Sequence, residues 1–192
     1  DRVGVMMGTA LGGIGFAEQE NAKYVHGGPR DVDPLLALTV FGGALSCNIA
    51  ITHGVSGVNS TNAMSCASGT LAIGQAFRAI ARGEADVMLA GGSEAPLYPL
   101  CYGSFSLIRA MSTRNDDPAT ASRPFDTGRD GFVMAEGSAV LVLESLEHAL
   151  ARGAAIYAEV AGAGLTNDAH HMTQPRPDGR EAVRAMQLAL AE

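Results

Sequence analysis

The sequence has little of what disulfide-bonded, metal-bound or membrane-embedded proteins are built from. Its 192 residues include 3 cysteines and no tryptophan. So sparse and odd a cysteine count does not indicate a disulfide framework, and the lack of any Cys-x-x-Cys pair argues against structural zinc. We therefore expect a reducing, cytoplasmic setting, with no bound metal and no cofactor.

The sequence also has few positively charged residues and few long apolar runs. The chain has 20 Asp and Glu and 13 Lys and Arg, which gives a net charge of −7. This negative charge argues against a general nucleic-acid-binding protein. No apolar run is long enough to cross a bilayer, and no basic helix suggests a membrane surface. Because residues 1–4 lack a signal-peptide pattern and an initiator methionine, we expect the chain to begin inside a larger protein.

What the sequence has in abundance is glycine, 24 residues clustered between apolar runs. The runs alternate between strand-like and helix-like patterns, which predicts the α/β class with a mainly parallel sheet covered on both faces. The glycine clusters fit no dinucleotide-binding pattern. We predict strands over residues 3–7, 59–65, 85–90, 138–144 and 156–163, and helices over 16–23, 34–51, 67–82, 100–111, 146–152 and 179–191, with Gly91-Gly92 ending a strand.

The most informative stretch leads into Cys66, where a predicted strand gives way to a predicted helix. A thiol at such a turn leaves the sheet and lies near the positive end of the helix dipole, where unpaired amides favour the thiolate. The same amides are suited to an oxyanion, and the small Ala67, Ser68 and Gly69 leave room for a substrate. From this position alone, a buried and unreactive thiol is an equally good interpretation.

The residues that follow resemble a known family. Cys66-Ala-Ser-Gly69 with Ala72-Ile-Gly74 is similar to the nucleophile motif of β-ketoacyl-(acyl-carrier-protein) synthases. The pattern is most similar to the type II elongation synthases of bacterial fatty-acid synthesis, and type II polyketide ketosynthases share it. Further blocks in the family's order cover nearly the whole chain, at residues 109–116, 122–126, 129–133, 136–137, 141–144 and 171–173.

The resemblance implies a thiolase-like fold of five layers, α-β-α-β-α, of which this chain covers only part. Residues 1–144 would hold the latter part of the N-terminal half with the nucleophile, and residues 145–192 the start of the C-terminal half. Family members are homodimers in which the strand before the nucleophile pairs across the interface. Their reaction is acyl transfer from acyl carrier protein to the cysteine, here Cys66, followed by decarboxylative Claisen condensation with malonyl-carrier protein.

The resemblance also implies roles for other positions. Leu11 matches the gate of the acyl pocket, Phe105 its lining, and Thr173 a position facing the pantetheine and malonyl groups. Arg30 and Arg109 match basic residues near the tunnel mouth, where an acidic carrier protein docks. From the residues alone, core packing is the better interpretation of Leu11 and Phe105, and a solvated surface charge is the alternative for each of the two arginines.

The family's decarboxylating histidines and supporting lysine lie downstream of every block present here. None of the five histidines, His170 and His171 included, stands in a family histidine motif. We therefore expect residues 1–192 alone to be inactive in condensation. With part of a core exposed, we also expect them to be poorly soluble.

Three other functions stay open at this stage. Type II polyketide ketosynthases share the same blocks. A chain-length factor, a non-condensing partner subunit, typically lacks the nucleophile, so the presence of Cys66 counts against that role. Gly91-Gly-Ser93-Glu-Ala95 faintly resembles the nucleophile elbow of serine hydrolases, although no Asp-then-His order follows it. Departures from the family are Ser65 in place of alanine, Ala135 in place of glycine, and Asp31 after Arg30 where a second basic residue is frequent.

Overall fold

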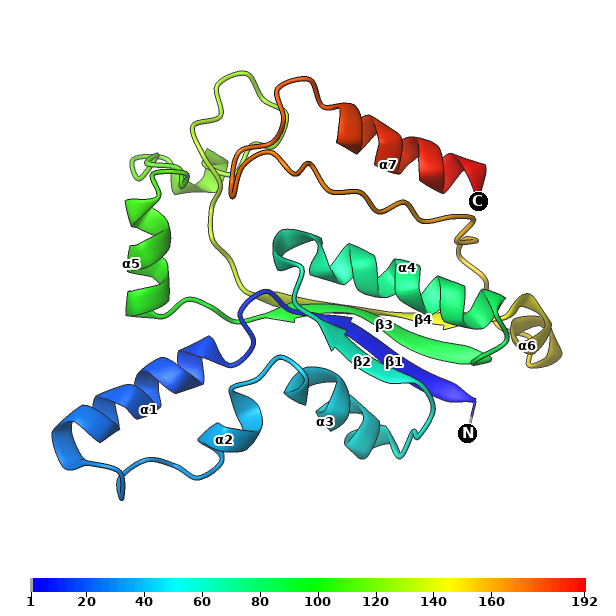
Figure 1. The fold of residues 1–192 in the computed structure, drawn as a ribbon, viewed down its shortest axis with the longest axis horizontal. Helices are drawn as coiled ribbons and strands as arrows, with labels where there is room; N and C mark the ends of the chain where they lie inside the picture. The colour runs from blue at the N-terminus through cyan, green and yellow to red at the C-terminus, as the bar shows by residue number, and fades with distance from the viewer. Residues whose placement is uncertain (1) are drawn as a thin grey trace.

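The computed structural model describes residues 2–192, and its framework is one four-stranded mixed sheet (Figure 1). The strands are β1 (Val3–Gly8), β2 (Asn59–Asn62), β3 (Val87–Glu94) and β4 (Gly137–Glu144), in the spatial order β2-β1-β3-β4. β1 runs parallel to β2 and β3, and β4 runs antiparallel to β3. The predicted α/β class and mainly parallel sheet are confirmed.

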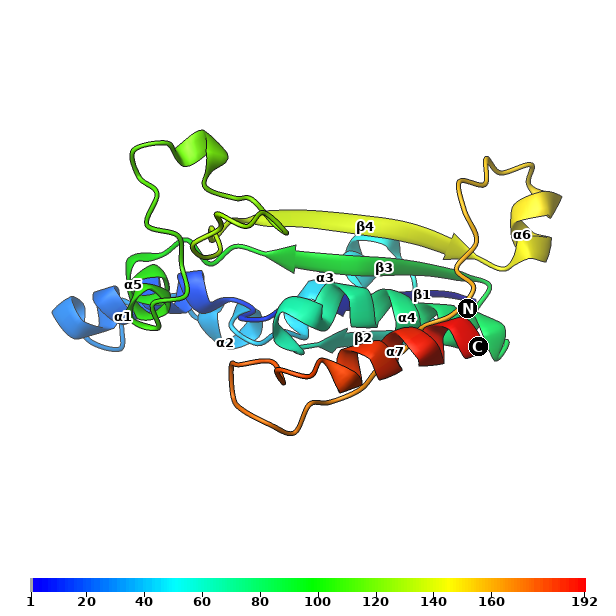
Figure 2. The same cartoon turned by 90° about the horizontal axis from the view of Figure 1, so that it is seen from above.

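Helices cover the sheet on both faces and beyond one end. α4 packs on β1 and β3, and α3 packs on β1 and β2 from the opposite face. Figures 1 and 2 both show α1 and α5 beyond the end toward which β1, β2 and β3 point. The helices are α1 (Ile14–Gly27), α2 (Leu36–Thr39), α3 (Ala44–His53), α4 (Ser68–Ala81), α5 (Pro99–Leu107), α6 (Leu146–Ala151) and α7 (Arg180–Ala191), with single 3-10 turns η1 (Ser65–Ala67) and η2 (Pro118–Thr120).

The core lies between α4 and the sheet. Ala72, Ala76 and Ala79 recur at helical spacing on one face of α4 and are completely or almost completely buried. Their small side chains let the helix lie close to the strands, where Met6 and Met88 fill the remaining space. This close approach brings the start of α4 down onto the end of the sheet, where Cys66 lies.

The helix predicted over residues 34–51 is wrong, because the chain there forms two helices. The loop after β1 crosses the junction between α2 and α3, where the amide of Gly13 donates to the carbonyl of Val40 at 3.2 Å. A side chain on Gly13 would overlap the backbone of Thr39 and Val40. The helix is therefore interrupted where another backbone passes over it.

The strand predicted over residues 156–163 is also wrong. That segment is extended, but among residues 2–192 no strand lies alongside to accept its backbone hydrogen bonds. It packs instead on α4, where Arg78 donates to the carbonyl of Ala163 at 2.5 Å. α7 lies over its other side, and side chains on Gly162 or Gly164 would overlap the α7 backbone. The layers are thus α3, sheet, α4, extended segment and α7.

Much apolar surface stays uncovered in residues 2–192. β4 lies at one edge of the sheet, and the side chains of Val140, Leu141 and Val142 are 44–58% exposed. β2 lies at the other edge. Within the described residues, no helix combines the length and apolarity that a membrane crossing requires.

Candidate active site

Cys66 lies in η1, the 3-10 turn that joins β2 to α4. Ser65 has a φ of 50°, a left-handed conformation that is uncommon for residues other than glycine. Such a turn reverses the chain within three residues, so that the thiol leaves the sheet at the helix entrance. Among residues 2–192 Cys66 is exposed, so within these residues the thiol is not the sealed, buried one considered from the sequence.

The side chains of Asn62 and Ser68 hold this turn. The amide nitrogen of Asn62 donates to the carbonyls of Ser68 at 3.0 Å and Met7 at 3.4 Å, and its oxygen accepts from the amide of Met64. The buried hydroxyl of Ser68 donates to the carbonyl of Ser65 at 2.7 Å. Asn62 therefore ties the Cys66 turn to the end of β1, while Ser68 closes the turn on itself.

Replacing Asn62 with alanine is expected to lower the free energy of unfolding by about 1–3 kcal/mol, because partly buried carbonyls lose their donor. The reactivity of the Cys66 thiol toward iodoacetamide should change as well, since the turn loses its tie to β1. Denaturant unfolding measures the first effect, and the rate of Cys66 alkylation measures the second.

Asn48→Ala is the matched control, because Asn48 is an exposed residue of α3 with no side-chain hydrogen bond among the described residues. Equal stabilities for the Asn62 and Asn48 variants would contradict a structural role for Asn62.

The amides that follow Cys66 are less available than the sequence suggested. The amide of Ala67 donates to the carbonyl of Met64 at 3.2 Å, and that of Ser68 donates to the carbonyl of Ser65. The expectation that the amides at the helix start are unpaired is therefore wrong for these two residues, because the 3-10 turn uses them. That this turn binds an oxyanion stays a prediction, and it requires donors other than the amides of Ala67 and Ser68.

Three glycines set how deeply the Cys66 turn lies on the sheet. A side chain on Gly8 of β1 would overlap the backbone of Ser68 and Gly69. A Cβ on Gly92 of β3 would lie 3.2 Å from Gly69 Cα and 3.3 Å from Gly8 O. α4 thus begins in direct backbone contact with the ends of two strands, which only residues without Cβ permit.

Leu11 leaves the same edge of the sheet as Cys66. Gly8 and Asn62 are paired in neighbouring parallel strands, and the amide of Thr9 continues the ladder by donating to the carbonyl of Asn62 at 3.1 Å. Leu11 is three residues beyond Gly8, and Cys66 is four residues beyond Asn62. The predicted acyl-pocket gate and the predicted nucleophile are therefore on adjacent connections.

The other predicted site residues lie on separate segments. Phe105 is half-buried in α5, and its ring meets that of Phe132 edge-to-face with centroids 6.0 Å apart. Arg30 is exposed between α1 and α2, and Arg109 is exposed just after α5 with a φ of 58°. The amide of Thr173 donates to Nδ1 of His171 at 3.1 Å. The ring contact of Phe105 and the hydrogen bond of Thr173 are made with residues outside the Cys66 turn.

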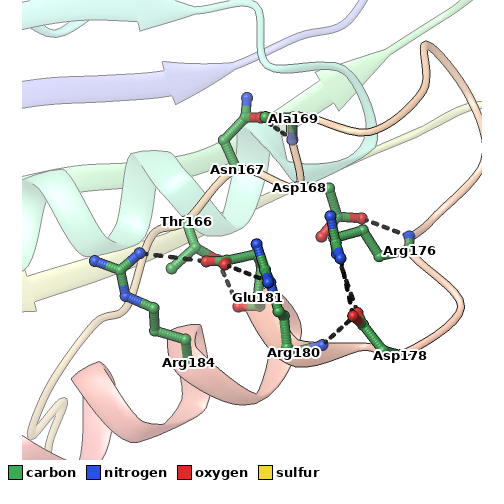
Figure 3. A network of polar contacts seen from close by, with 9 residues as sticks. All are labelled: Thr166, Asn167, Asp168, Ala169, Arg176, Asp178, Arg180, Glu181 and Arg184. Atoms are coloured by element: carbon green, nitrogen blue, oxygen red, sulfur yellow. Dashed lines mark hydrogen bonds and ion pairs between the residues drawn. The ribbon is translucent and has the colours of Figure 1, made fainter.

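The loop that carries His170, His171 and Thr173 is pinned by a polar network that sequence analysis missed (Figure 3). Asp178 pairs with the Arg176 guanidinium at 2.9 Å, which lowers the pKa of the carboxyl to about 2. Asp168 accepts from the amide of Arg176, and the hydroxyl of Thr166 donates to the α7 carbonyl of Glu181. Beside this network the residues 166–171 and Ala182 line an open hollow of about 640 Å³.

Sequence proximity gives a weak signal for this network. The stretch from 176 to 184 alternates acidic and basic residues directly before a predicted helix, but only the fold shows which carboxylate each guanidinium meets. Among residues 2–192, no group of three or more His, Cys, Asp or Glu side chains is arranged to hold a metal ion.

Cys66 differs from the other two cysteines. Cys101 is buried in α5, and burial, followed by the charges of Glu18 and Glu94, raises the pKa of its thiol. A buried thiol that resists ionisation is a poor nucleophile. Cys47 is exposed but lies in the middle of α3, away from any strand-to-helix turn.

Ser93 does not lie on a nucleophile elbow. β3 continues through Gly91 and Gly92 to Glu94, so the prediction that the two glycines end the strand is wrong. Both glycines pair with β4, and a side chain on Gly91 would overlap the carbonyl of Ala139. Ser93 is itself paired with Ser138 inside the ladder. An elbow requires the serine at a strand-to-helix turn, so the hydrolase interpretation fails.

Comparison with known proteins finds similarity along the whole chain. The family model described as "Beta-ketoacyl synthase, N-terminal domain" matches residues 1–149, and "Beta-ketoacyl synthase, C-terminal domain" matches residues 157–192. The chain is 47% identical over 192 residues to "3-oxoacyl-[acyl-carrier-protein] synthase 2" of Synechocystis sp., and 46% identical over 190 residues to the protein of that name from Staphylococcus aureus. It covers 46% and 47% of these two relatives, about half their length.

A solved structure shares the fold as well. It holds a type II polyketide synthase acyl-carrier protein in complex with its ketosynthase bound to the hexaketide. The match has a TM-score of 0.94 at 39% sequence identity, and covers 99% of this chain and 48% of the solved one.

Proposed function

The chain belongs to the β-ketoacyl synthase family, and from that premise we propose that it carries the nucleophile, Cys66, of a 3-oxoacyl-(acyl-carrier-protein) synthase of fatty-acid elongation. Its fold is the thiolase-like α/β fold of that family, of which the chain covers part. The observation that carries the proposal is the exposed Cys66 thiol at the turn between β2 and α4.

In the proposed first step, the Cys66 thiolate attacks the carbonyl carbon of an acyl thioester. The new bond joins Cys66 Sγ to the acyl carbon, and the bond to the sulfur of the carrier's pantetheine breaks, so that the carrier thiolate leaves and takes up a proton. Malonyl-carrier protein then loses CO₂, and its carbanion attacks the Cys66 thioester and releases the cysteine. Residues 1–192 supply the first step only, because the family's decarboxylating histidines and lysine have no counterpart among them.

The carrier protein and the second subunit belong to the same proposal. Arg30 and Arg109 are exposed cations suited to an acidic carrier protein, while Leu11 and Phe105 line the acyl pocket and Thr173 faces the pantetheine. Homodimer formation through β2 is supported by its edge position in the sheet. Three free cysteines fit the reducing cytoplasm that we propose as its location.

The experiment is to incubate the whole protein that carries this chain with acyl-carrier protein and to find the acylated residue by peptide mass mapping. We expect one acyl group on Cys66 and none on Cys47 or Cys101, because only Cys66 combines exposure with a strand-to-helix turn. Alkylation by iodoacetamide should follow the order Cys66, Cys47, Cys101, since Cys101 is buried. Acylation spread equally over Cys47 and Cys66, or absent from both, would sink the proposal.

A polyketide ketosynthase is the second candidate, and the match to a ketosynthase of that class at a TM-score of 0.94 favours it. The fatty-acid synthase and the polyketide ketosynthase are distinguished by the product that each forms. A fatty-acid synthase condenses saturated acyl groups once per reduction cycle, whereas a polyketide ketosynthase extends unreduced poly-β-ketone chains. A chain-length factor is disfavoured by Cys66 itself, and it would form no acyl-enzyme in the mapping experiment.

A further inference from the structure

Glu94, at the carboxyl end of β3, accepts hydrogen bonds from the loop that carries Leu11. Its carboxylate accepts from the hydroxyl of Thr9 at 3.1 Å and from the amides of Ala10 at 2.5 Å and Leu11 at 3.3 Å. The Thr9 hydroxyl in turn accepts from the amide of Gly12 at 3.1 Å. Four consecutive residues after β1 are thus organised around one carboxylate.

The carboxylate of Glu18 holds the start of α5 in the same way. Glu18 of α1 accepts from the amides of Leu100 at 2.8 Å and Cys101 at 3.4 Å, at the first turn of α5. Glu18 therefore ties α1, which follows the Leu11 loop, to the start of α5, the helix that carries Phe105.

This arrangement makes the Leu11 loop depend on Glu94. Gly12, with a φ of 57°, and Gly13 follow Leu11, so the loop has little conformational preference of its own. A hollow of about 230 Å³ lies beside the loop, lined by Thr9, Gly12 and Gly13 and by residues of α3. The Glu94 carboxylate holds the loop up to Leu11, and the hydrogen bond from the Gly13 amide to the Val40 carbonyl holds it beyond Gly12.

We propose that Glu94 is a positioning residue that holds Leu11, on the connection next to that of Cys66, and so decides which acyl-chain lengths the enzyme accepts. The proposal rests on the proposed function, in which Leu11 borders the acyl pocket. Short acyl groups occupy only the space next to the thiol, whereas long ones must pass Leu11. Glu94 does not touch the reacting atoms, so its loss should change selectivity more than the chemistry of acyl transfer.

The test is Glu94→Gln in the whole protein. Glutamine keeps the shape, but it has one acceptor oxygen and places an NH₂ donor against the N–H and O–H donors of the loop. Acylation of Cys66 is followed by mass spectrometry with butanoyl-, octanoyl- and hexadecanoyl-carrier protein. We expect the ratio of hexadecanoyl to butanoyl transfer rates to change by about tenfold or more, and butanoyl transfer to change by less than about threefold.

Glu159→Gln is the matched control, because Glu159 is exposed and has no side-chain partner among the described residues. It should leave the rate ratio unchanged. Thr9→Val removes the buried hydroxyl that links Glu94 to Gly12, so it should shift the ratio in the same direction. If Glu94→Gln does not fold, the Thr9 variant decides in its place.

The outcomes separate the two proposals. If the unaltered protein transfers acyl groups to Cys66 and Glu94→Gln, or Thr9→Val in its place, keeps the same rate ratio, Glu94 is not a positioning residue and the proposed function stands. An equal slowing of all three substrates also overturns the inference, because it indicates a general structural role. If the unaltered protein accepts no acyl group at all, the proposed function itself fails.

Discussion

Replacing Cys66 with alanine is expected to lower acyl transfer and condensation by the whole protein by at least about 10³-fold, because the acyl group loses the atom that accepts it. The fold should survive, since Cys66 is exposed and its side chain is not among those that hold the turn. Steady-state product formation from acyl- and malonyl-carrier protein measures the loss, and thermal unfolding within about 2 °C of the unaltered protein shows that the fold is kept.

Cys47→Ala is the control for that experiment. Cys47 is also exposed, but it lies inside α3, so its loss should leave the rate within about twofold. Retained condensation in the Cys66 variant would show that the nucleophile lies elsewhere. A large loss in the Cys47 variant would show that exposure at a strand-to-helix turn is the wrong criterion.

Replacing Gly8 with alanine is expected to lower the free energy of unfolding by about 3 kcal/mol and to reduce acylation of Cys66 severely. A methyl group on Gly8 overlaps the backbone of Ser68 and Gly69, and neither can rotate away as a flexible side chain would. The start of α4 must therefore lift from β1, and the Cys66 turn must move with it. Denaturant unfolding and the acylation rate measure the two effects.

Gly103→Ala is the matched control in α5. A Cβ there meets nothing within 4 Å, and alanine is the better helix former by about 0.5–1 kcal/mol, so this variant should be equally or more stable. If Gly8→Ala is as stable as Gly103→Ala and is acylated normally, the backbone contact between β1 and α4 does not position Cys66.

Sequence analysis succeeded where local patterns decide the structure. The apolar runs that form β1, β3 and β4 were predicted as strands, and α4 and α7 were predicted as helices. These predictions succeed because the spacing of apolar residues indicates a buried strand or a buried helix face. The strand-to-helix turn at Cys66 was found for the same reason. The resemblance to β-ketoacyl synthases came from ordered blocks, and the family match confirms it.

The errors arose where a distant backbone decides the outcome. The pair Gly91-Gly92 was predicted to end a strand, but both residues stay inside β3 because β4 and α4 lie against them. Residues 156–163 have a strand pattern, yet no strand pairs with them among residues 2–192. In both cases the local residues are compatible with two structures, and neighbours far along the chain select one.

What the sequence by itself determined is the α/β class, the family and the identity of the candidate nucleophile, because these depend on residue types in order along the chain. Tertiary structure alone decided that Glu94 holds the Leu11 loop, that Asn62 holds the Cys66 turn, and that Cys66 is exposed while Cys101 is buried. The physical reason is that hydrogen bonds and burial depend on distances in space. Glu94 and Leu11 are 83 residues apart in the chain and meet only because β1 and β3 pair side by side.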